Sequence, residues 1–324
     1  MLLPRPYRRG DMKGSDGMIR RILILMAVLM LALPCTAQAE WYRAIKEAEN
    51  ELNAADDLDK KWINILLIGS DTRSDKKDAE RSDTMMICSV NLDAGEIKLT
   101  SLERDMWVEI PGRSGHHKLN AAHSYGGPEL LMKTINTLFH MNVTHYVSVN
   151  FYDFCGIVDL LGGVTVPLTA AEISVINSTV SASDYGDTDY TPIPKGASEA
   201  HLNGAQALAY VRIRKIDDDF GRTARQRTLL SALLHGVIGR PVMDLVALYD
   251  DAYSRLSTNY SPGDLLAIAQ TVAGHAMGDM PQLSLPTPEH FHYDESNGVS
   301  KVVYDSEATV RQLHEFIYGG AEEE

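Results

Sequence analysis

The stretch Ile65-Leu66-Leu67-Ile68-Gly69-Ser70-Asp71-Thr72-Arg73 is followed, after a polar segment, by Arg81-Ser82-Asp83-Thr84-Met85-Met86. One apolar run ends just before Asp71 and another begins just after Asp83, which predicts two strands joined by a polar loop. This arrangement brings both carboxylates to one edge of a sheet, where a hard cation finds the oxygen ligands that it prefers. The arginines beside them indicate a phosphate anion at the same place. The sequence therefore predicts a combined Mg²⁺ and phosphate site built on these two aspartates.

The composition is that of a globular protein with an acidic surface. The chain has 324 residues, of which 44% are hydrophobic and 23% charged, so a sizeable core and about two domains are expected. The formal net charge of −14 disfavours a nucleic-acid partner. Positive charge nevertheless gathers locally, which fits a small anionic substrate, at Arg104, Lys118, Arg212, Arg214, Arg222, Arg225 and Arg227.

Residues 1–39 are predicted to be a basic and then apolar leader. Arg20-Arg21 precede twelve apolar residues, 22–33, and Ala37-Gln38-Ala39 has the small-x-small pattern that signal peptidase cleaves. The run is shorter than the ~20 residues of a membrane span, which is typical of a signal peptide, whereas an uncleaved anchor would extend to Ala39. Both readings stay open, and both predict that the bulk of the chain lies outside the cytoplasmic membrane.

Behind the leader we expect a charged stalk, 40–61, and one α/β or α+β domain, 62–320. Apolar runs predict strands at 63–69, 84–92, 96–102 and 144–149. Helical spacing predicts helices at 128–139, 152–161, 203–210, from 222 onward, and at 242–255, 262–277 and 307–318. Residues 177–198, rich in Ser, Thr, Asp, Gly and Pro, are predicted to be a mobile loop. Cys88 and Cys155 are expected to be free and buried.

Two further groups of basic residues extend the predicted anion site. Arg104-Asp105 closes a predicted strand, and a solvated surface ion pair is the plainer interpretation of such a dipeptide. We favour the functional one, because this strand neighbours the one that begins near Asp83. In Arg212-Ile213-Arg214, strand alternation would place both guanidinium groups on one face, where an anion would relieve their repulsion.

The start of the next helix carries Arg222 and Arg225 on one face, followed by Gln226. Cations in a first helical turn oppose the helix dipole, so a bound pyrophosphate would stabilise them there. The structural alternative is that Asp217, Asp218 and Asp219 neutralise the neighbouring arginines.

Six ordered motifs resemble the LytR-CpsA-Psr family. They are Leu-Leu-Ile-Gly-Ser-Asp71-Thr-Arg73, Arg81-Ser-Asp83-Thr-Met, Ser-Leu-Glu103-Arg104-Asp105, Lys118-Leu-Asn120-Ala-Ala, Leu202-Asn-Gly-x-x-Ala-Leu-x-Tyr210-Val-Arg212-Ile-Arg214 and Asp219-Phe-Gly-Arg222-x-x-Arg225-Gln226. The similarity extends over residues 62–318 and is weaker after residue 239. The chain departs from the family at Glu103, where the family usually has proline.

The resemblance implies a single domain with a central mixed β-sheet flanked by helices and a deep apolar channel for a lipid. Such proteins transfer a glycopolymer phosphate from a polyprenyl pyrophosphate carrier to peptidoglycan on the outer face of the cytoplasmic membrane. Carried over, Asp71 and Asp83 would hold Mg²⁺. The basic and amide side chains that would contact the phosphates, including catalytic ones, are Arg81, Arg104, Lys118, Arg212, Arg214, Arg222, Arg225 and Gln226.

The chemistry of the residues agrees with this implication. Phosphoryl transfer needs charge neutralisation and positioning more than a covalent protein group. Asp105 and Asp83 are the candidates for a general base. Two alternatives of other classes stay open: a pyrophosphatase that uses water as the acceptor, and a non-catalytic protein that binds a polyprenyl lipid or a wall polymer. The sequence does not indicate which glycopolymer is moved.

Overall fold

The computed structural model describes residues 49–70, 82–181, 191–238, 240, 242–273 and 278–319. The chain divides into two compact units, 1–48 and 49–324. The predicted leader, 1–39, lies outside the described residues, as do residues 40–48 of the predicted stalk. Within the described ranges, no helix is both long and apolar enough to cross a membrane.

A six-stranded mixed sheet forms the centre of the second unit, in the order β10-β3-β2-β1-β6-β9. Its inner strands β1 and β2 are antiparallel, and β6 runs parallel to β1. The strands are β1 (Trp62–Ser70), β2 (Ser82–Asn91), β3 (Ile97–Leu102), β6 (His145–Asn150), β9 (Ser257–Thr258) and β10 (Gln282–Leu285). Apolar residues occur at successive positions along β1 and β2 because both faces of these strands are covered.

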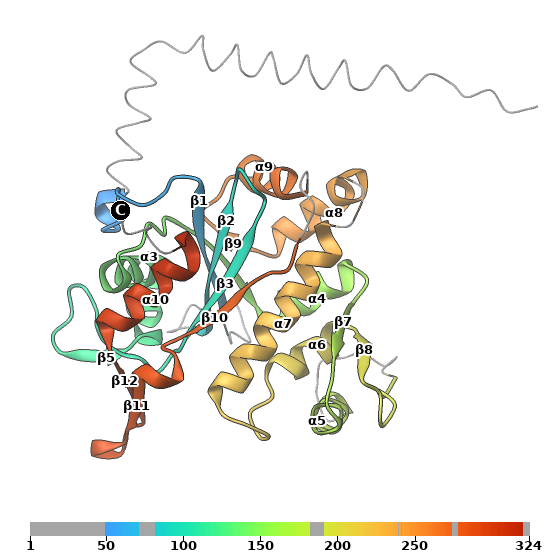
Figure 1. The fold of residues 1–324 in the computed structure, drawn as a ribbon. Helices are drawn as coiled ribbons and strands as arrows, with labels where there is room; N and C mark the ends of the chain where they lie inside the picture. The colour runs from blue at the N-terminus through green and yellow to red at the C-terminus, as the bar shows by residue number, and fades with distance from the viewer. Residues whose placement is uncertain are drawn as a thin grey trace, which may run out of the picture. The chain divides into compact units, whose positions relative to one another are not determined.

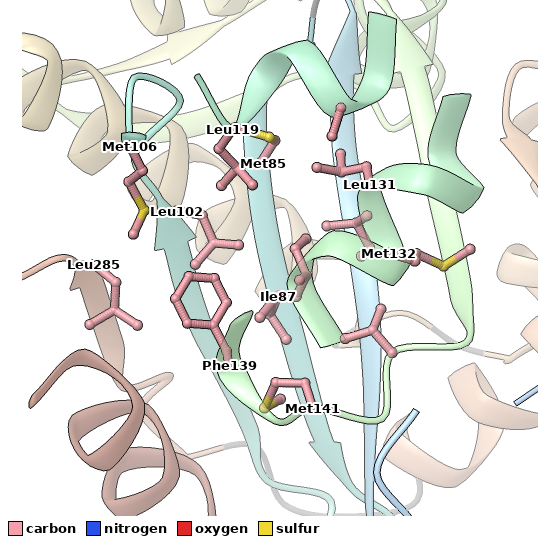
Figure 2. Close-up of a cluster of buried hydrophobic side chains, with 14 of the residues drawn as sticks. Met85, Ile87, Leu102, Met106, Leu119, Leu131, Met132, Phe139, Met141 and Leu285 are labelled. Atoms are coloured by element: carbon pink, nitrogen blue, oxygen red, sulfur yellow. The ribbon is translucent and has the colours of Figure 1, made fainter. Parts of the chain in front are cut away.

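Helices α3 (Asn120–Phe139) and α10 (Ser306–Tyr318) cover one face of the sheet, and α7 (Asp219–Ile238) and α9 (Pro262–Ala273) cover the other (Figure 1). The α3 side holds the main core, in which Phe139 lies beside Ile87 and Leu102 (Figure 2). On the α7 side, Ile65 and Leu99 are buried, and Leu230 of α7 packs against them as part of the same cluster. The sheet is therefore the middle layer of three.

A second core lies among smaller elements that follow β6. Val158, Ile176, Leu202 and Leu229 are buried in it. Its elements are α4 (Phe151–Leu160), β7 (Val164–Pro167), α5 (Ala170–Ser181), β8 (Glu199–Leu202) and α6 (Gly204–Val211). The remaining elements are β4 (Trp107–Glu109), β5 (His116–Lys118), α8 (Val242–Ser254), β11 (Phe291–Asp294), β12 (Lys301–Tyr304) and the short 3₁₀ helices Pro288–His290 and Ser296–Gly298.

The structure confirms the four predicted strands and the two free cysteines, of which Cys88 is buried and Cys155 half-buried. It corrects the start of the helix expected at 128–139. Helix α3 begins at Asn120, and Gly126 and Gly127 form a kink inside it, where Gly127 has a φ of +66°. A glycine adopts this conformation without the Cβ clash of other residues.

Three other predictions are corrected. Residues 212–214 are not a strand, because α6 ends at Val211 and the chain turns there with the Ile213 side chain buried in the second core. Residues 177–181 belong to α5 rather than to a loop, and the following part of that prediction, 182–190, lies outside the described residues. The helix expected from Arg222 begins one turn earlier, at Asp219.

We expect Phe139→Ala to lower the free energy of unfolding by about 3–5 kcal/mol, because it removes a fully buried ring from the main core and leaves a cavity. Urea unfolding followed by circular dichroism measures this change. Phe139→Leu, the matched control, should cost clearly less. A loss below about 1 kcal/mol for the alanine variant would contradict the packing described.

Candidate active site

A bulge in β2 sets the position of Asp83. Gly69 of β1 pairs with Thr84, and the next residue, Ser70, pairs with Ser82, so that Asp83 is the extra residue between them. A Cβ atom at Gly69 would lie 3.0 Å from the Thr84 Cβ, so the two strands approach closely beside the bulge. Bulges of this kind redirect a side chain at the end of a ladder.

Two guanidinium groups bind the Asp83 carboxylate. Arg104 donates from Nη1 to Oδ1 at 2.7 Å, and Arg214 donates from Nη2 to Oδ2 at 3.0 Å. Arg104 is the second residue after β3, whereas Arg214 lies in the turn after α6. Segments that are far apart in the sequence therefore meet at this sheet edge. The predicted association of Arg104, Arg214 and Asp83 is present.

The backbone after β3 holds Arg104 and Asp105 in place. The Arg104 carbonyl accepts from the Asn120 amide at 3.1 Å, which ties it to the start of α3. Lys118, at the end of β5, places its Nζ atom 3.0 Å from Asp105 Oδ1. Lys118 and Asp105 thereby join the cluster, as the sequence predicts, through an ion pair that is partly exposed.

Arg222, in the first turn of α7, is the most deeply buried cation of the cluster. Its side chain is 2% exposed, and Nη2 donates to Asp219 Oδ2 at 2.6 Å. Nη2 also contacts the Asp83 carbonyl oxygen at 3.4 Å. Burial, reinforced by the charges of Arg104 and Arg214, lowers the pKa of Arg222, although Asp219 opposes this. Arg222 Nε and Nη1 have no hydrogen-bond partner among the described residues. Arg104 Nε makes no hydrogen bond of good geometry there either, but it forms an ion pair with Asp219 Oδ2 at 3.3 Å.

Glu103 and Asp219 form a pair of adjacent carboxyl groups. Burial, then the charge of Asp219 and the hydrogen bond between the two side chains, raise the pKa of Glu103 to about 8. Glu103 is only 3% exposed. Two carboxyl groups in contact share a proton rather than carry two charges. At neutral pH the pair therefore bears one negative charge, which Arg104 and Arg222 face.

The electrostatic balance of the cluster favours an anion. Its cations are Arg104, Lys118, Arg214 and Arg222, and its acidic residues are Asp83, Asp105, Asp219 and Glu103, the last with a pKa raised to about 8. Buried guanidinium N–H groups without partners cost free energy. A phosphate oxygen would satisfy those of Arg222 and Arg104 with charge-assisted hydrogen bonds. The arrangement is suited to hold and neutralise phosphoryl oxygens.

The structure gives Arg225 and Gln226 contacts away from these unpaired groups. Arg225 binds both carboxylate oxygens of Asp217 at 2.6 Å and donates to the Ile213 carbonyl at 2.9 Å. Gln226 Nε2 contacts the Val211 carbonyl at 3.4 Å. Both side chains thus brace the turn that carries Arg214. Their predicted contact with pyrophosphate stays a prediction, and the structural alternative of an aspartate partner holds for Arg225.

Arg212 also lies apart from the ion-pair network. Its guanidinium group stacks over the ring of Phe151, with Cζ 4.5 Å from the ring centroid. The strand that would have aligned it with Arg214 is absent, because the chain turns after α6. The predicted role of Arg212 at the phosphate therefore stays a prediction.

The other predicted site residues, Asp71 and Arg81, lie outside the described residues. In the ranges that are described, no group of three His, Cys, Asp or Glu side chains gathers as a metal site. Asp83 is the one predicted metal ligand whose position is known, and its side chain is 23% exposed at the sheet edge.

A cavity of about 550 Å³ opens elsewhere in this unit, between the paired strands β7 and β8, residues 191–197 and the start of α6. Asp159, His201 and Gln206 line it, together with Gly162, Gly163, Thr191, Pro192, Ile193, Pro194, Ala197, Glu199, Ala200 and Asn203. None of the clustered cations lines this cavity. The anion site is therefore defined by its unpaired guanidinium groups and not by this hollow.

Two members of the cluster were missing from the predicted site. The sequence assigns Asp219 only a neutralising role beside the arginines, and Glu103 only a departure from the family's pattern. The spacing of Asp219 and Arg222, three residues apart at a helix start, is the signal that predicts their pairing. No local signal predicts the contact between Glu103 and Asp219, because more than one hundred residues separate them in the sequence.

The fold and the cluster together define an α/β protein with an arginine-lined anion site at a sheet edge. The model of the LytR_cpsA_psr family matches residues 29–315. The chain belongs to this family.

Three relatives illustrate the similarity. The polyisoprenyl-teichoic acid–peptidoglycan teichoic acid transferase TagV of Bacillus subtilis (strain 168) is 27% identical over 284 residues, which cover 82% of this chain and 70% of TagV. The TagU transferase of the same description from Bacillus cereus (strain AH820) is 32% identical over 202 residues, or 60% of this chain and 59% of TagU. The chain thus spans less than two thirds of TagU. A solved structure of TagT bound to LI-WTA superimposes with a TM-score of 0.66 at 26% identity, covering 82% of this chain and 95% of that one.

We expect the stability of the protein to fall as pH rises from about 5 to 8, because of Glu103. Its folded-state pKa of about 8 exceeds its ordinary value of 4.5, so in this window the folded protein binds a proton that the unfolded chain has released. The slope from this one group is at most about 1.4 kcal/mol per pH unit. Urea unfolding across this window measures it.

Glu103→Gln is the matched control, because the amide keeps a neutral donor and cannot titrate. The variant should gain stability over the wild type progressively toward pH 8. Parallel pH profiles for the two proteins would contradict the protonated state of Glu103.

Proposed function

We propose that this protein transfers a glycopolymer phosphate from a polyprenyl pyrophosphate carrier to a hydroxyl group of peptidoglycan. The observation that carries the proposal is the buried Arg222 guanidinium, with unpaired N–H groups, beside Arg104 and Arg214 at the sheet edge. Its family membership and its similarity to TagV and TagU, which are named as polyisoprenyl-teichoic acid–peptidoglycan teichoic acid transferases, support the same reaction.

In the proposed reaction, the acceptor hydroxyl oxygen forms a bond to the glycan-linked phosphorus. The bond from that phosphorus to the bridging oxygen breaks, and polyprenyl phosphate leaves as an anion. Arg104 and Arg222 donate hydrogen bonds to the phosphoryl oxygens and neutralise the charge that gathers there. Arg214, half exposed, reaches the same place from the turn after α6. No covalent protein intermediate is required.

A base must take the proton of the acceptor hydroxyl. Asp105 is one candidate, and its contact with Lys118 fixes it beside Arg104. Asp83 is the other, although both of its oxygens are bound by guanidinium groups. The geometry therefore favours Asp105.

Mg²⁺ is proposed as the cofactor, with Asp71 and Asp83 as its protein ligands. Mg²⁺ is commonly bound by one or two carboxylates together with substrate phosphates. Ser70 and Ser82, the residues that precede the two aspartates, pair with each other in the sheet, and this supports a shared site. When bound, the ion would supply further neutralisation of the pyrophosphate charge.

The sheet also offers a place for the polyprenyl chain on its α7 side. None of the six residues of β6 is fully buried, although the strand lies between β1 and β9. In the apolar helix α4, only Val158 is fully buried. Apolar side chains that are only half-buried here, such as Val147 and Phe154, leave an apolar surface on this side of the sheet. We propose that the lipid lies against it.

The proposed location is the outer face of the cytoplasmic membrane or the cell wall, and the family relatives act on wall polymers by name. The leader of residues 1–39 supports export, as a signal peptide or as an anchor.

The first test is a transfer assay with the full chain in detergent, Mg²⁺, a short polyprenyl pyrophosphate–glycan and peptidoglycan oligomers, read by mass spectrometry. We expect a covalent glycan–phosphate–peptidoglycan adduct that is lost with EDTA and in Asp71→Ala. Release of glycan phosphate without the adduct would support the pyrophosphatase. Lipid binding without any turnover would support the non-catalytic binding protein.

The second test compares single arginine variants in the same assay. Arg222→Ala should lower kcat/KM by at least about 100-fold, or ~3 kcal/mol, because it removes donors to the transferring phosphate. Thermal unfolding of the variant shows whether it folds, and Arg222→Lys, which keeps a positive charge, is the matched control. Together they separate this loss of activity from misfolding. Arg212→Ala tests the prediction from the sequence: a comparable loss means that Arg212 reaches the phosphate, and a small loss means that its contact with Phe151 is structural.

A further inference from the structure

Three aromatic side chains form a continuous shelf, which we call the aromatic shelf: Phe220 of α7, and Phe291 and Tyr293 of β11. The rings of Phe220 and Phe291 are stacked, with centroids 5.0 Å apart and an interplanar angle of 22°. Phe291 meets Tyr293 edge to face, at 5.4 Å and 87°. Phe291 and Tyr293 share a face of the strand because they are two residues apart.

The aromatic shelf is attached to the anion site at both ends. Phe220 directly follows Asp219, the partner of Arg222. On the hairpin side, the Val302 amide of β12 donates to the Asp105 carbonyl at 2.9 Å. Val302 is also the residue that pairs with Tyr293. Tyr293 therefore lies on a hairpin that is tied to Asp105, beside a ring that is tied to Asp219.

The acidic residues of the anion site affect the pKa of the Tyr293 hydroxyl group. Burial, followed by the negative charges of Glu103, Asp218, Asp219 and Asp105, raises the pKa of its hydroxyl group. Acidic residues on two separate segments, the end of β3 and the start of α7, act on this one hydroxyl, which agrees with its position next to the cluster.

Tyr293 is nevertheless 51% exposed, and the hairpin does not need it as an anchor. Lys301 of β12 holds the hairpin through a 2.9 Å ion pair with Asp294 and by lying over the ring of Trp107, 5.0 Å from its centroid. Phe291 packs against the main core. The Tyr293 ring is therefore exposed, oriented by its neighbours, and not needed to anchor the hairpin. Such a ring is preorganised for a ligand.

We propose that Tyr293 binds the sugar ring that is linked directly to the transferred phosphate. This inference rests on the proposed function and adds a donor-sugar subsite to the same site. The C–H bonds on one face of a pyranose carry partial positive charge, and they pack on the negative face of an aromatic ring. A sugar joined to the phosphate by a single ester bond cannot lie far from the arginines. Tyr293 is the exposed ring of the aromatic shelf, and it pairs with Val302, whose amide donates to the Asp105 carbonyl.

The test measures the binding of two probes by the full chain in detergent: a short polyprenyl pyrophosphate without sugar, and the same lipid carrying one hexosamine. In Tyr293→Ala the affinity for the sugar-bearing lipid should fall about tenfold, and the affinity for the sugar-free lipid should stay within twofold. Tyr293→Phe, which keeps the ring, should retain most of the affinity. His292→Ala, the exposed neighbour on the other face of β11, is the matched control and should bind both probes normally.

Other outcomes overturn the inference. Equal losses for both probes would mean that Tyr293 supports the phosphate site, and no loss for either would mean that it binds no donor sugar. A higher KM for peptidoglycan with unchanged binding of both lipids would assign the shelf to the acceptor instead. Failure of the wild-type protein to bind the sugar-free lipid would contradict the proposed function, and so it is distinguishable from failure of the subsite.

Discussion

A buried positive charge organises this site. The Arg222 guanidinium is almost completely removed from water, and a charge in that position requires partners. Asp219 supplies one carboxylate at 2.6 Å, but one carboxylate cannot satisfy five N–H groups. Arg104, Asp83 and a protonated Glu103 lie around this pair. Each of them changes the electrostatic potential at the others. The described residues leave Arg222 with donors that an incoming anion can satisfy.

Helix α7 combines this role with the construction of the fold. Arg225 fixes the turn after α6, and Arg227 donates to Ser101 of β3 at 2.8 Å. Arg222 is thus held on a helix that two other arginines attach to separate parts of the unit. Because its backbone has little freedom to move, the unpaired N–H groups of Arg222 stay in place without a ligand. Such organisation in advance lowers the cost of binding and of stabilising a transition state.

The sequence predicts those parts of the structure that depend on local patterns. Apolar runs locate β1, β2, β3 and β6, and the residues at their ends, Asp83 and Arg104, belong to the site as expected. The prediction fails at 212–214, where alternation resembles a strand but Ile213 is buried below a turn. It also fails to include Asp219, whose partners Glu103 and Arg104 lie at the end of β3, and Tyr293, whose aromatic shelf includes Phe220, more than 70 residues away in the sequence. Contacts between distant segments leave no periodic signal.

The bulge at Asp83 allows β2 both to point this carboxylate into the site and to keep its other side chains packed in the core. Side chains in a strand alternate between faces, so a shift of one position would ordinarily turn Met85 and Ile87 away from α3. Here the additional residue is absorbed at the end of the ladder, beyond the paired residues that carry the core. The direction of the Asp83 carboxylate therefore does not depend on how the rest of β2 packs, and a substitution can change one without the other. A related protein without an acidic residue at position 83 would lose this carboxylate and keep the fold. A fold of this kind can therefore persist in proteins that no longer carry out the reaction.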